Sequence, residues 1–207
     1  VVDEDGAVNL TLEGKDPDGN PLEFRLVQGA GHGEMIGHGE MWTYQPERNY
    51  SGVDRVTFVV DDGELVSPPA EVRITVNAQP DAPTLGAIKV LAGAREDEVL
   101  IISHERLLLS SDAVDADGDE IVFRVREIVT GALLAEGLPL EETVLKPGAS
   151  LSWKPATDRH GLLEAFSVVA EDEGLLHSGE PIVVRVEVEG VPDDPGVTWN
   201  TPGGIVY

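Results

Sequence analysis

The 207-residue chain contains no cysteine, so it can form neither a disulfide nor a thiolate-ligated zinc site. Aromatic residues make up only 5% of the chain, and no apolar run approaches the roughly 18 residues of a transmembrane helix. Basic residues are also scarce, with 14 Lys and Arg against 39 Asp and Glu and a formal net charge of -25. Nucleic acids and anionic membrane surfaces are bound through clustered Lys and Arg. We therefore expect no nucleic-acid partner and no direct membrane insertion.

Turn-forming residues are abundant, with 23 Gly and 14 Pro. This composition favours short strands joined by turns over long helices. Apolar residues alternate with polar ones at residues 8–12, 22–26, 56–60 and 72–76, which is the pattern of half-buried β-strands. Roughly seven such strands at this spacing are typical of an immunoglobulin-like β-sandwich. The sequence therefore predicts an all-β protein.

The chain contains an internal repeat, and each copy of the repeat carries one acidic turn. The first acidic turn is Asp16-Pro17-Asp18-Gly19-Asn20, and the second is Asp115-Ala116-Asp117-Gly118-Asp119. Each precedes an alternating strand, and other segments match in the same order: Glu4-Asp5 with Glu96-Asp97, Tyr44-Gln45-Pro46 with Trp153-Lys154-Pro155, Asp61-Asp62 with Glu171-Asp172, and Pro80-Asp81-Ala82-Pro83 with Pro192-Asp193-Asp194-Pro195. An internal repeat in a chain of this length predicts two domains.

The repeat also sets the expected boundaries. We expect one β-sandwich at residues 1–78, a proline-stiffened linker at 79–84 and a second β-sandwich with insertions at 85–190. Residues 191–207 are expected to be a linker and the start of a following unit, so that the chain is part of a longer protein. One insertion precedes the second acidic turn, where Ser103 is a candidate N-cap for a short helical turn. The other lies between residues 126 and 150, and we expect both insertions to be surface excursions.

The ordered set of motifs resembles the cadherin-like tandem repeats of large bacterial surface and secreted proteins. The motifs that carry this resemblance are Glu4-Asp5-Gly6, the first acidic turn, His32-Gly33-Glu34-Met35, Tyr44-Gln45-Pro46, Gly52-Val53-Asp54, Asp62-Gly63 and Val72-Arg73-Ile74-Thr75-Val76-Asn77, with Asp112-Ala113-Val114 leading into the second acidic turn. The resemblance implies two tandem Ig-like domains arranged end to end, calcium-dependent assembly and an extracellular or cell-surface location.

The acidic turns have the chemistry of a calcium site. Calcium takes six to eight oxygen ligands in varied geometry, and a turn of the form Asp-X-Asp-Gly-Asx projects several carboxylate oxygens towards one point. The spacing differs from an EF-hand, because Gly directly follows the second acidic residue and no Glu closes a twelve-residue loop. The alternative interpretation is a pair of solvated Asp-Gly turns.

The resemblance also implies particular ligands, because cadherins hold calcium between consecutive domains. One site at the junction of the two units would take its ligands from Glu4, Glu47, Asp81, Asp115, Asp117 and Asp172. A second set, Asp16, Asp18 and Asp62, would lie at the other end of the first unit. Glu96, Asp158 and Asp193 would face a following unit.

Three other interpretations compete with calcium. His32-Gly33-Glu34 and His38-Gly39-Glu40 offer two His and two Glu to zinc, but they also suit a Gly-rich turn between strands. Trp42 and Trp153 would be sugar-stacking platforms in a carbohydrate-binding module, or core residues of the sandwich. Carboxylate pairs are compatible with a glycosidase, but the chain has no nucleophile elbow, phosphate-binding loop or zinc-protease motif. We therefore expect no enzyme.

The sequence thus predicts a Ca²⁺-binding, calcium-rigidified repeat segment of an extracellular adhesin or cell-surface protein. Its expected partners are neighbouring repeats of the same chain and a protein or glycan ligand at a surface. The alternative function is a carbohydrate-binding module of a secreted protein.

Overall fold

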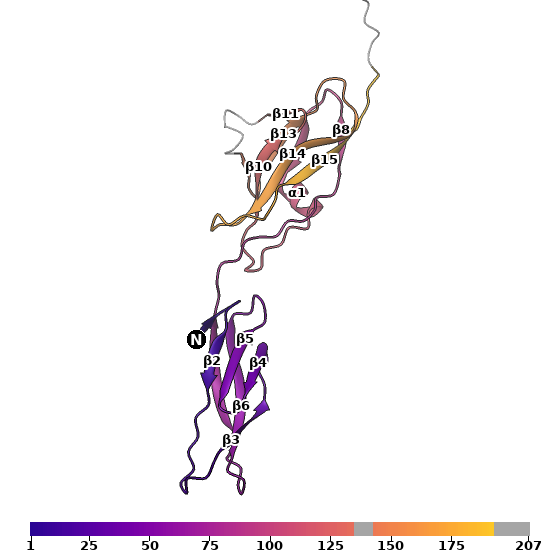
Figure 1. The fold of residues 1–207 in the computed structure, drawn as a ribbon. Helices are drawn as coiled ribbons and strands as arrows, with labels where there is room; N and C mark the ends of the chain where they lie inside the picture. The colour runs from indigo at the N-terminus through magenta and orange to yellow at the C-terminus, as the bar shows by residue number, and fades with distance from the viewer. Residues whose placement is uncertain (135–142, 193–207) are drawn as a thin grey trace, which may run out of the picture. The chain divides into compact units, whose positions relative to one another are not determined.

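The structure, a computed structural model, describes residues 1–134 and 143–192. It divides into two compact units: unit 1 spans Val1–Asp81, and unit 2 begins at Ala82. Each unit is a β-sandwich (Figure 1). The all-β class and the Ig-like fold predicted from the sequence are confirmed. Asp193 and the expected start of a following unit lie outside the described residues.

Unit 1 packs a four-stranded sheet against a three-stranded sheet. The four-stranded sheet has the order β1 (Val2–Asp3), β7 (Ala70–Asn77), β6 (Gly52–Asp61) and β3 (Glu23–Gln28), and the other has the order β2 (Val8–Thr11), β5 (Met41–Pro46) and β4 (Gly33–His38). Only the β1–β7 pair among these is parallel. The apolar alternation turns one face of each sheet inwards, and the core is formed by Val2, Tyr44, Val56, Ile74 and Val76.

Unit 2 repeats this plan with two additions. Its five-stranded sheet has the order β12 (Val144–Leu145), β10 (Val122–Ile128), β14 (Gly161–Glu171), β15 (Ile182–Glu189) and β8 (Leu91–Arg95). Its three-stranded sheet has the order β11 (Ala132–Leu134), β13 (Ser150–Lys154) and β9 (Leu100–Ser103). Helix α1 (His104–Ser110) follows β9 directly. The additions relative to unit 1 are therefore β12 and α1.

The strand registers confirm the internal repeat at the level of single residues. Tyr44 lies opposite Val8 in unit 1, as Trp153 lies opposite Leu100 in unit 2. Both aromatic residues are fully buried, which supports the interpretation of Trp153 as a core residue. Trp42 is only partly buried, and its indole N–H donates to the carbonyl of Gly39.

The prediction that both insertions are surface excursions is wrong. Ser103 caps α1 as expected, because its side chain accepts a hydrogen bond from the N–H of Arg106. The helix nevertheless inserts Leu107 into the core with no exposed surface. In the second insertion, β12 extends the sheet beside β10 and buries Leu145 completely. Both insertions carry apolar side chains at positions that face the core, so they enlarge it.

Within the described residues, no helix combines the length and the apolar character that crossing a bilayer requires.

Candidate metal centre

The two acidic turns share one backbone conformation. In the first, Oδ1 of Asp16 accepts hydrogen bonds from the N–H groups of Asp18 and Asn20, both at 2.9 Å. In the second, Oδ1 of Asp115 accepts from the N–H groups of Asp117 and Asp119, both at 3.0 Å. The glycine at the fourth position has a φ of +82° in each turn, which a residue with a side chain adopts only with strain. Backbone hydrogen bonds therefore occupy one oxygen of the leading Asp and hold the turn in shape.

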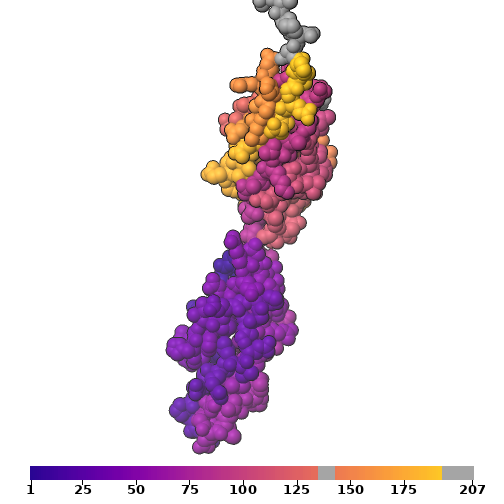
Figure 2. All heavy atoms as spheres, turned by 90° about the vertical axis from the view of Figure 1, so that its right-hand side faces the viewer, coloured from indigo at the N-terminus to yellow at the C-terminus, as the bar shows by residue number. Residues whose placement is uncertain are grey.

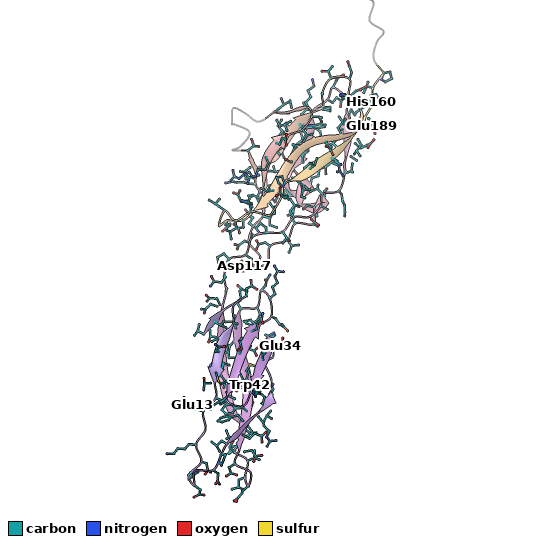
Figure 3. All side chains as sticks on the ribbon, viewed as in Figure 1. Glu13, Glu34, Trp42, Asp117, His160 and Glu189 are labelled. Carbon is teal, nitrogen blue, oxygen red and sulfur yellow. The ribbon has the colours of Figure 1, made fainter. Side chains whose placement is uncertain are left out.

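In unit 2, the other oxygen of this carboxylate is available for a ligand. Oδ2 of Asp115 is shielded from solvent and has no hydrogen-bond partner among the described residues. A buried carboxylate oxygen without a donor is costly, because burial removes its hydration. A cation would satisfy it. Asp117, which is labelled in Figure 3, lies on the same turn and is exposed.

The third expected ligand of unit 2, Asp172, directly follows β14. Its side chain is 3% exposed, and its Oδ1 accepts a hydrogen bond from the N–H of Leu176 at 2.9 Å. Its neighbour Glu171 forms a two-pronged salt bridge with Arg124, at 2.5 and 2.7 Å. The Arg124 guanidinium holds the pKa of Glu171 below its ordinary value, against the effect of burial. This salt bridge fixes the end of β14 from which Asp172 projects.

The Arg124–Glu171 pair has a counterpart in unit 1, where Arg25 contacts Asp61 at 2.6 Å. Arg25 matches Arg124 and Asp61 matches Glu171 in the internal repeat, so the two pairs recur together. The unit 1 pair is much more exposed.

Two pairs of expected ligands in unit 1 lie close together, Asp16 with Asp62 and Glu4 with Asp81. At the end that carries the first acidic turn, Asp62 accepts from the N–H groups of Leu65 and Glu64 and also lies within hydrogen-bonding reach of Asp16. These backbone N–H groups, that of Leu65 foremost, hold the pKa of Asp62 below its ordinary value. Asp62 thus lies beside Asp16, and Asp18 belongs to the same turn as Asp16.

At the other end of unit 1, Glu4 and Asp81 present carboxylate oxygens within 4.8 Å of each other. Glu4 is 5% exposed and accepts a hydrogen bond from the N–H of Gln79, two residues before Asp81. Two unit negative charges at this distance repel each other by about 3 kcal/mol at an effective dielectric constant of about 20. A divalent cation bound between them would replace this repulsion with attraction.

Glu47 is placed differently. Its side chain is 67% exposed and lies 3.8 Å from Nδ1 of His32, whose ring stacks on Tyr50. The structure therefore gives Glu47 a surface position beside His32, and no described contact joins it to Glu4.

The opposite end of unit 2 repeats the arrangement around Glu4. Glu96 is 4% exposed and accepts from the N–H of Val191, as Glu4 accepts from Gln79. Nδ1 of His160, which is labelled in Figure 3, lies 3.3 Å from the second oxygen of Glu96. Sequence reasoning identified Glu96 but missed His160, because the first unit has no histidine at the matching position. Asp158 lies in the turn before His160 with a φ of +56°.

The zinc alternative has no support in the described residues. His32 precedes β4 and His38 ends it, so the two side chains are about 20 Å apart along an extended strand. These residues form no group of three or more metal-ligating side chains. Trp153 cannot stack on a sugar, because it has no exposed surface.

Comparison with known proteins shows a family match in unit 1 and similar folds among solved structures. Residues 1–75 match the family model of a bacterial Ig domain. The fold is similar to that of human protocadherin-24 EC1-2, with a TM-score of 0.52 at 15% identity, covering 88% of this chain and 88% of that one. It is also similar to human CDH23 EC21-23, with a TM-score of 0.51 at 20% identity, covering 87% and 67%. The resemblance to bacterial cadherin-like repeats is confirmed.

The similarity of this chain to a third solved structure is weaker. An endo-fucoidan hydrolase of glycoside hydrolase family 107 aligns with 93% of the chain at 16% identity, but the TM-score is only 0.34. The chain spans 28% of the length of that hydrolase. No curated protein matches the sequence of the chain.

Proposed function

We propose that the chain is a calcium-binding repeat segment of an extracellular adhesin or cell-surface protein. Calcium would bind at the boundary between the two repeats, with Glu4 and Asp81 contributed by unit 1 and Asp115, Asp117 and Asp172 by unit 2. Glu47 would be a further ligand of this site. Asp16, Asp18 and Asp62 would bind a second ion at the other end of unit 1. The proposed role is mechanical, and we expect no catalytic activity.

The shielded Oδ2 of Asp115 is the observation that carries this proposal. Two backbone hydrogen bonds hold the turn around it in shape, so binding an ion requires little reorganisation of the backbone. On the side of unit 1, the close pair of Glu4 and Asp81 supplies charge that a cation would neutralise. Hard carboxylate oxygens of this kind favour Ca²⁺ over softer metals.

The connection between the repeats also supports a shared site. Only Ala82 and Pro83 separate Asp81 from Thr84. The backbone of Thr84 pairs with Val114, the residue directly before Asp115. Three peptide steps span at most about 11 Å, so the chain itself limits how far Asp81 can lie from Thr84. An ion bound by both Asp81 and the second acidic turn would restrict the hinge between the repeats.

Thermal unfolding and X-ray scattering, each with calcium and with a chelator, test the proposal. A ligand present at 100 times its dissociation constant stabilises the folded state by about 2.7 kcal/mol. We therefore expect calcium to raise the melting temperature of the full chain by several degrees. We also expect it to narrow the distribution of distances between the repeats. Identical melts and identical scattering in the two conditions would contradict calcium binding.

A matched pair of variants separates ligation from general charge. Asp115→Asn with Asp117→Asn keeps an oxygen that accepts the turn hydrogen bonds but removes two charges, so most of the calcium-induced shift should disappear. Glu127→Ala with Glu187→Ala removes two charges from exposed strand positions and should leave the shift intact. Equal losses in both double variants would show that calcium acts only by screening the net charge of -25.

A further inference from the structure

Strand β3 is an edge strand of unit 1, the part of the chain drawn in indigo to purple in Figures 1 and 2. It pairs with β6 on one side, and no strand of the described residues pairs with its other side. Phe24 lies opposite Val60 of β6, whose N–H and carbonyl groups both bond to Ser67 and so point away from β3. Opposed residues of an antiparallel pair either bond to each other or both turn away. The N–H and carbonyl groups of Phe24 therefore point to the open side of β3, and the N–H of Leu26, two residues further on, points the same way.

Unit 2 shows that this edge accepts another strand. Strand β10 matches β3 in the internal repeat, and β12 pairs antiparallel with β10 on the equivalent side. Phe123, the counterpart of Phe24, lies opposite Leu145. The N–H of Val125 donates to the carbonyl of Thr143 at 3.0 Å. The backbone of this edge is thus shaped to bond to an added strand.

Unit 1 cannot supply such a strand from its own sequence. In unit 2, β12 comes from the connection between β11 and β13. The matching connection in unit 1 joins β4 to β5 and consists only of Gly39 and Glu40. The open edge of β3 therefore follows from residues in the middle of unit 1.

The side chains that β3 directs away from the core are complementary to a second copy of themselves. Glu23 and Arg25 flank Phe24, and both are exposed. If two β3 strands pair antiparallel with Phe24 opposite Phe24, Glu23 of each copy lies opposite Arg25 of the other. Opposite charges in directly opposed positions stabilise a β-sheet, and like charges destabilise it.

The surroundings of Glu23 also favour a cation on the open side. Glu23 lies opposite Asp61 of β6, which is a like charge. Arg25 of the same copy contacts Asp61 at 2.6 Å, and Glu23 has no salt bridge among the described residues. An arginine from a second strand would therefore give Glu23 the partner that its own unit does not provide.

We propose that unit 1 forms a symmetric dimer with unit 1 of a second copy of this chain through the open edges of β3. Phe24 of each copy exchanges backbone N–H···O=C hydrogen bonds with Phe24 of the other. The N–H of Leu26 donates to the carbonyl of Leu22 of the other copy. The two four-stranded sheets become one continuous sheet, and Glu23 pairs with Arg25 across the junction. Backbone hydrogen bonds provide affinity in this mode of recognition, and the side-chain pairs fix the register.

The symmetry of the contact limits the size of the assembly. Both copies use the same surface, so the contact is isologous and closes at a dimer. One added strand buries less than a standard interface of about 1,600 Å², and each copy carries a net charge of -25. We therefore expect a weak dimer that forms at high protein concentration. None of the residues in the contact is a proposed metal ligand, so the dimer does not depend on calcium.

Sedimentation velocity of the full chain between about 10 µM and 1 mM at physiological salt measures this association. A chelator is present, so that calcium cannot link the copies. The expected result is an average mass that rises with concentration towards that of a dimer and levels off there. A chain that stays monomeric at the highest concentration overturns the proposal, as does a mass that continues to rise beyond a dimer.

Charge reversal tests the register. Glu23→Arg and Arg25→Glu each place like charges opposite one another in both symmetry-related pairs, so each should weaken the dimer about tenfold or more. An equimolar mixture of the two variants restores both opposite-charge pairs and should dimerise like the unchanged chain. The controls are Glu71→Arg and Arg55→Glu, which make the same changes of charge at an exposed pair on β6 and β7 and should have no effect. Test variants that dimerise normally overturn the proposal, as does a mixture that associates no better than its components.

Amide hydrogen exchange of the unchanged chain gives the decision if Arg25→Glu disturbs unit 1 by breaking the contact with Asp61. Exchange at Phe24 and Leu26 should slow as the concentration rises through the range in which the dimer forms. Exchange in β4, the edge strand of the other sheet of unit 1, should not change. Unchanged exchange at Phe24 and Leu26 overturns the proposal.

Discussion

The hydroxyl group of Tyr44 donates a 3.0 Å hydrogen bond to Oδ2 of Asp54, and both side chains are buried in unit 1. Asp54 also accepts from the backbone N–H groups of Gly31, His32 and Arg55. Burial alone raises the pKa of Asp54, but these four donors outweigh it and hold the pKa below the ordinary value. Burial and the nearby carboxylate raise the pKa of Tyr44. This cluster ties β5, β6 and the loop before β4 together.

We predict that Asp54→Asn destabilises unit 1 by about 2–3 kcal/mol, because an amide cannot accept from all the donors and carries no charge. Native-state hydrogen exchange of the full chain should show the loss in β5 and β6, with unit 2 unchanged. Asp61→Asn is the control: it breaks the more exposed pair with Arg25 and should cost about 1 kcal/mol or less. Equal effects of the two substitutions would contradict a special role for the buried cluster.

The Arg124–Glu171 pair predicts how unit 2 responds to acid. The pKa of Glu171 is lower in the folded chain than its ordinary value of 4.5. The stabilisation is therefore present above that pH and is lost as the pH falls through the lower, folded value. Unit 2 should lose stability between pH 5 and more acidic conditions, as measured by urea unfolding at a series of pH values.

Glu171→Gln should flatten this acid dependence and cost about 2–3 kcal/mol at neutral pH, less than a fully buried pair because Arg124 is about a quarter exposed. Glu164→Gln removes the carboxylate of an exposed pair with Arg185, at 3.5 Å, and serves as the control. If Glu171→Gln leaves the acid dependence of stability unchanged, other carboxylates cause that dependence.

Leu107 should be the main contribution of α1 to stability. Leu107→Ala removes a fully buried side chain and should destabilise unit 2 by about 2–5 kcal/mol. Leu109→Ala, in the same helix at an 82% exposed position, should change stability by less than about 0.5 kcal/mol. Denaturant unfolding followed by exchange in β9 and β10 compares the two, and similar costs would mean that α1 is only a surface addition.

Close packing explains a glycine in β4. A Cβ at position 33 would lie 2.5 Å from a ring carbon of Tyr44 and 2.6 Å from the carbonyl oxygen of Gln45. Gly33→Ala should therefore displace β5 and cost about 3 kcal/mol. Gly39→Ala, where a Cβ would meet nothing but φ is +61°, should cost about 1 kcal/mol from backbone strain alone. Thermal melts of the two variants test this order, and the reverse order would contradict it.

The sequence predicts the strands well, because period-two alternation reports directly which side chains face the core. The strand at Val56 and the strand at Val72 both appear where the alternation places them. It also predicts α1, because Ser103 is a strong N-cap residue. The burial of Leu107 and Leu145 could not be read from local pattern, since each depends on a space that distant strands leave open.

Some residues of the candidate site could be predicted from local sequence, and others could not. The acidic turns are local, so their carboxylates could be found from five consecutive residues. The pairing of Glu4 with Asp81 and the contact of His160 with Glu96 join residues far apart in sequence, and only the fold determines them. The internal repeat allowed Glu96 to be predicted, because Glu96 matches Glu4. It could not indicate His160, because no histidine of unit 1 matches it.

The acidic turn carries its own scaffold. In both units the first Asp holds two N–H groups of the same turn, and one glycine conformation completes the loop. The conformation of this loop depends on its own five residues, so the same loop can occur in successive sandwiches whose surrounding strands differ in sequence. Substitution of the leading Asp would therefore remove two things at once: the hydrogen bonds that hold the loop and one of its carboxylate charges.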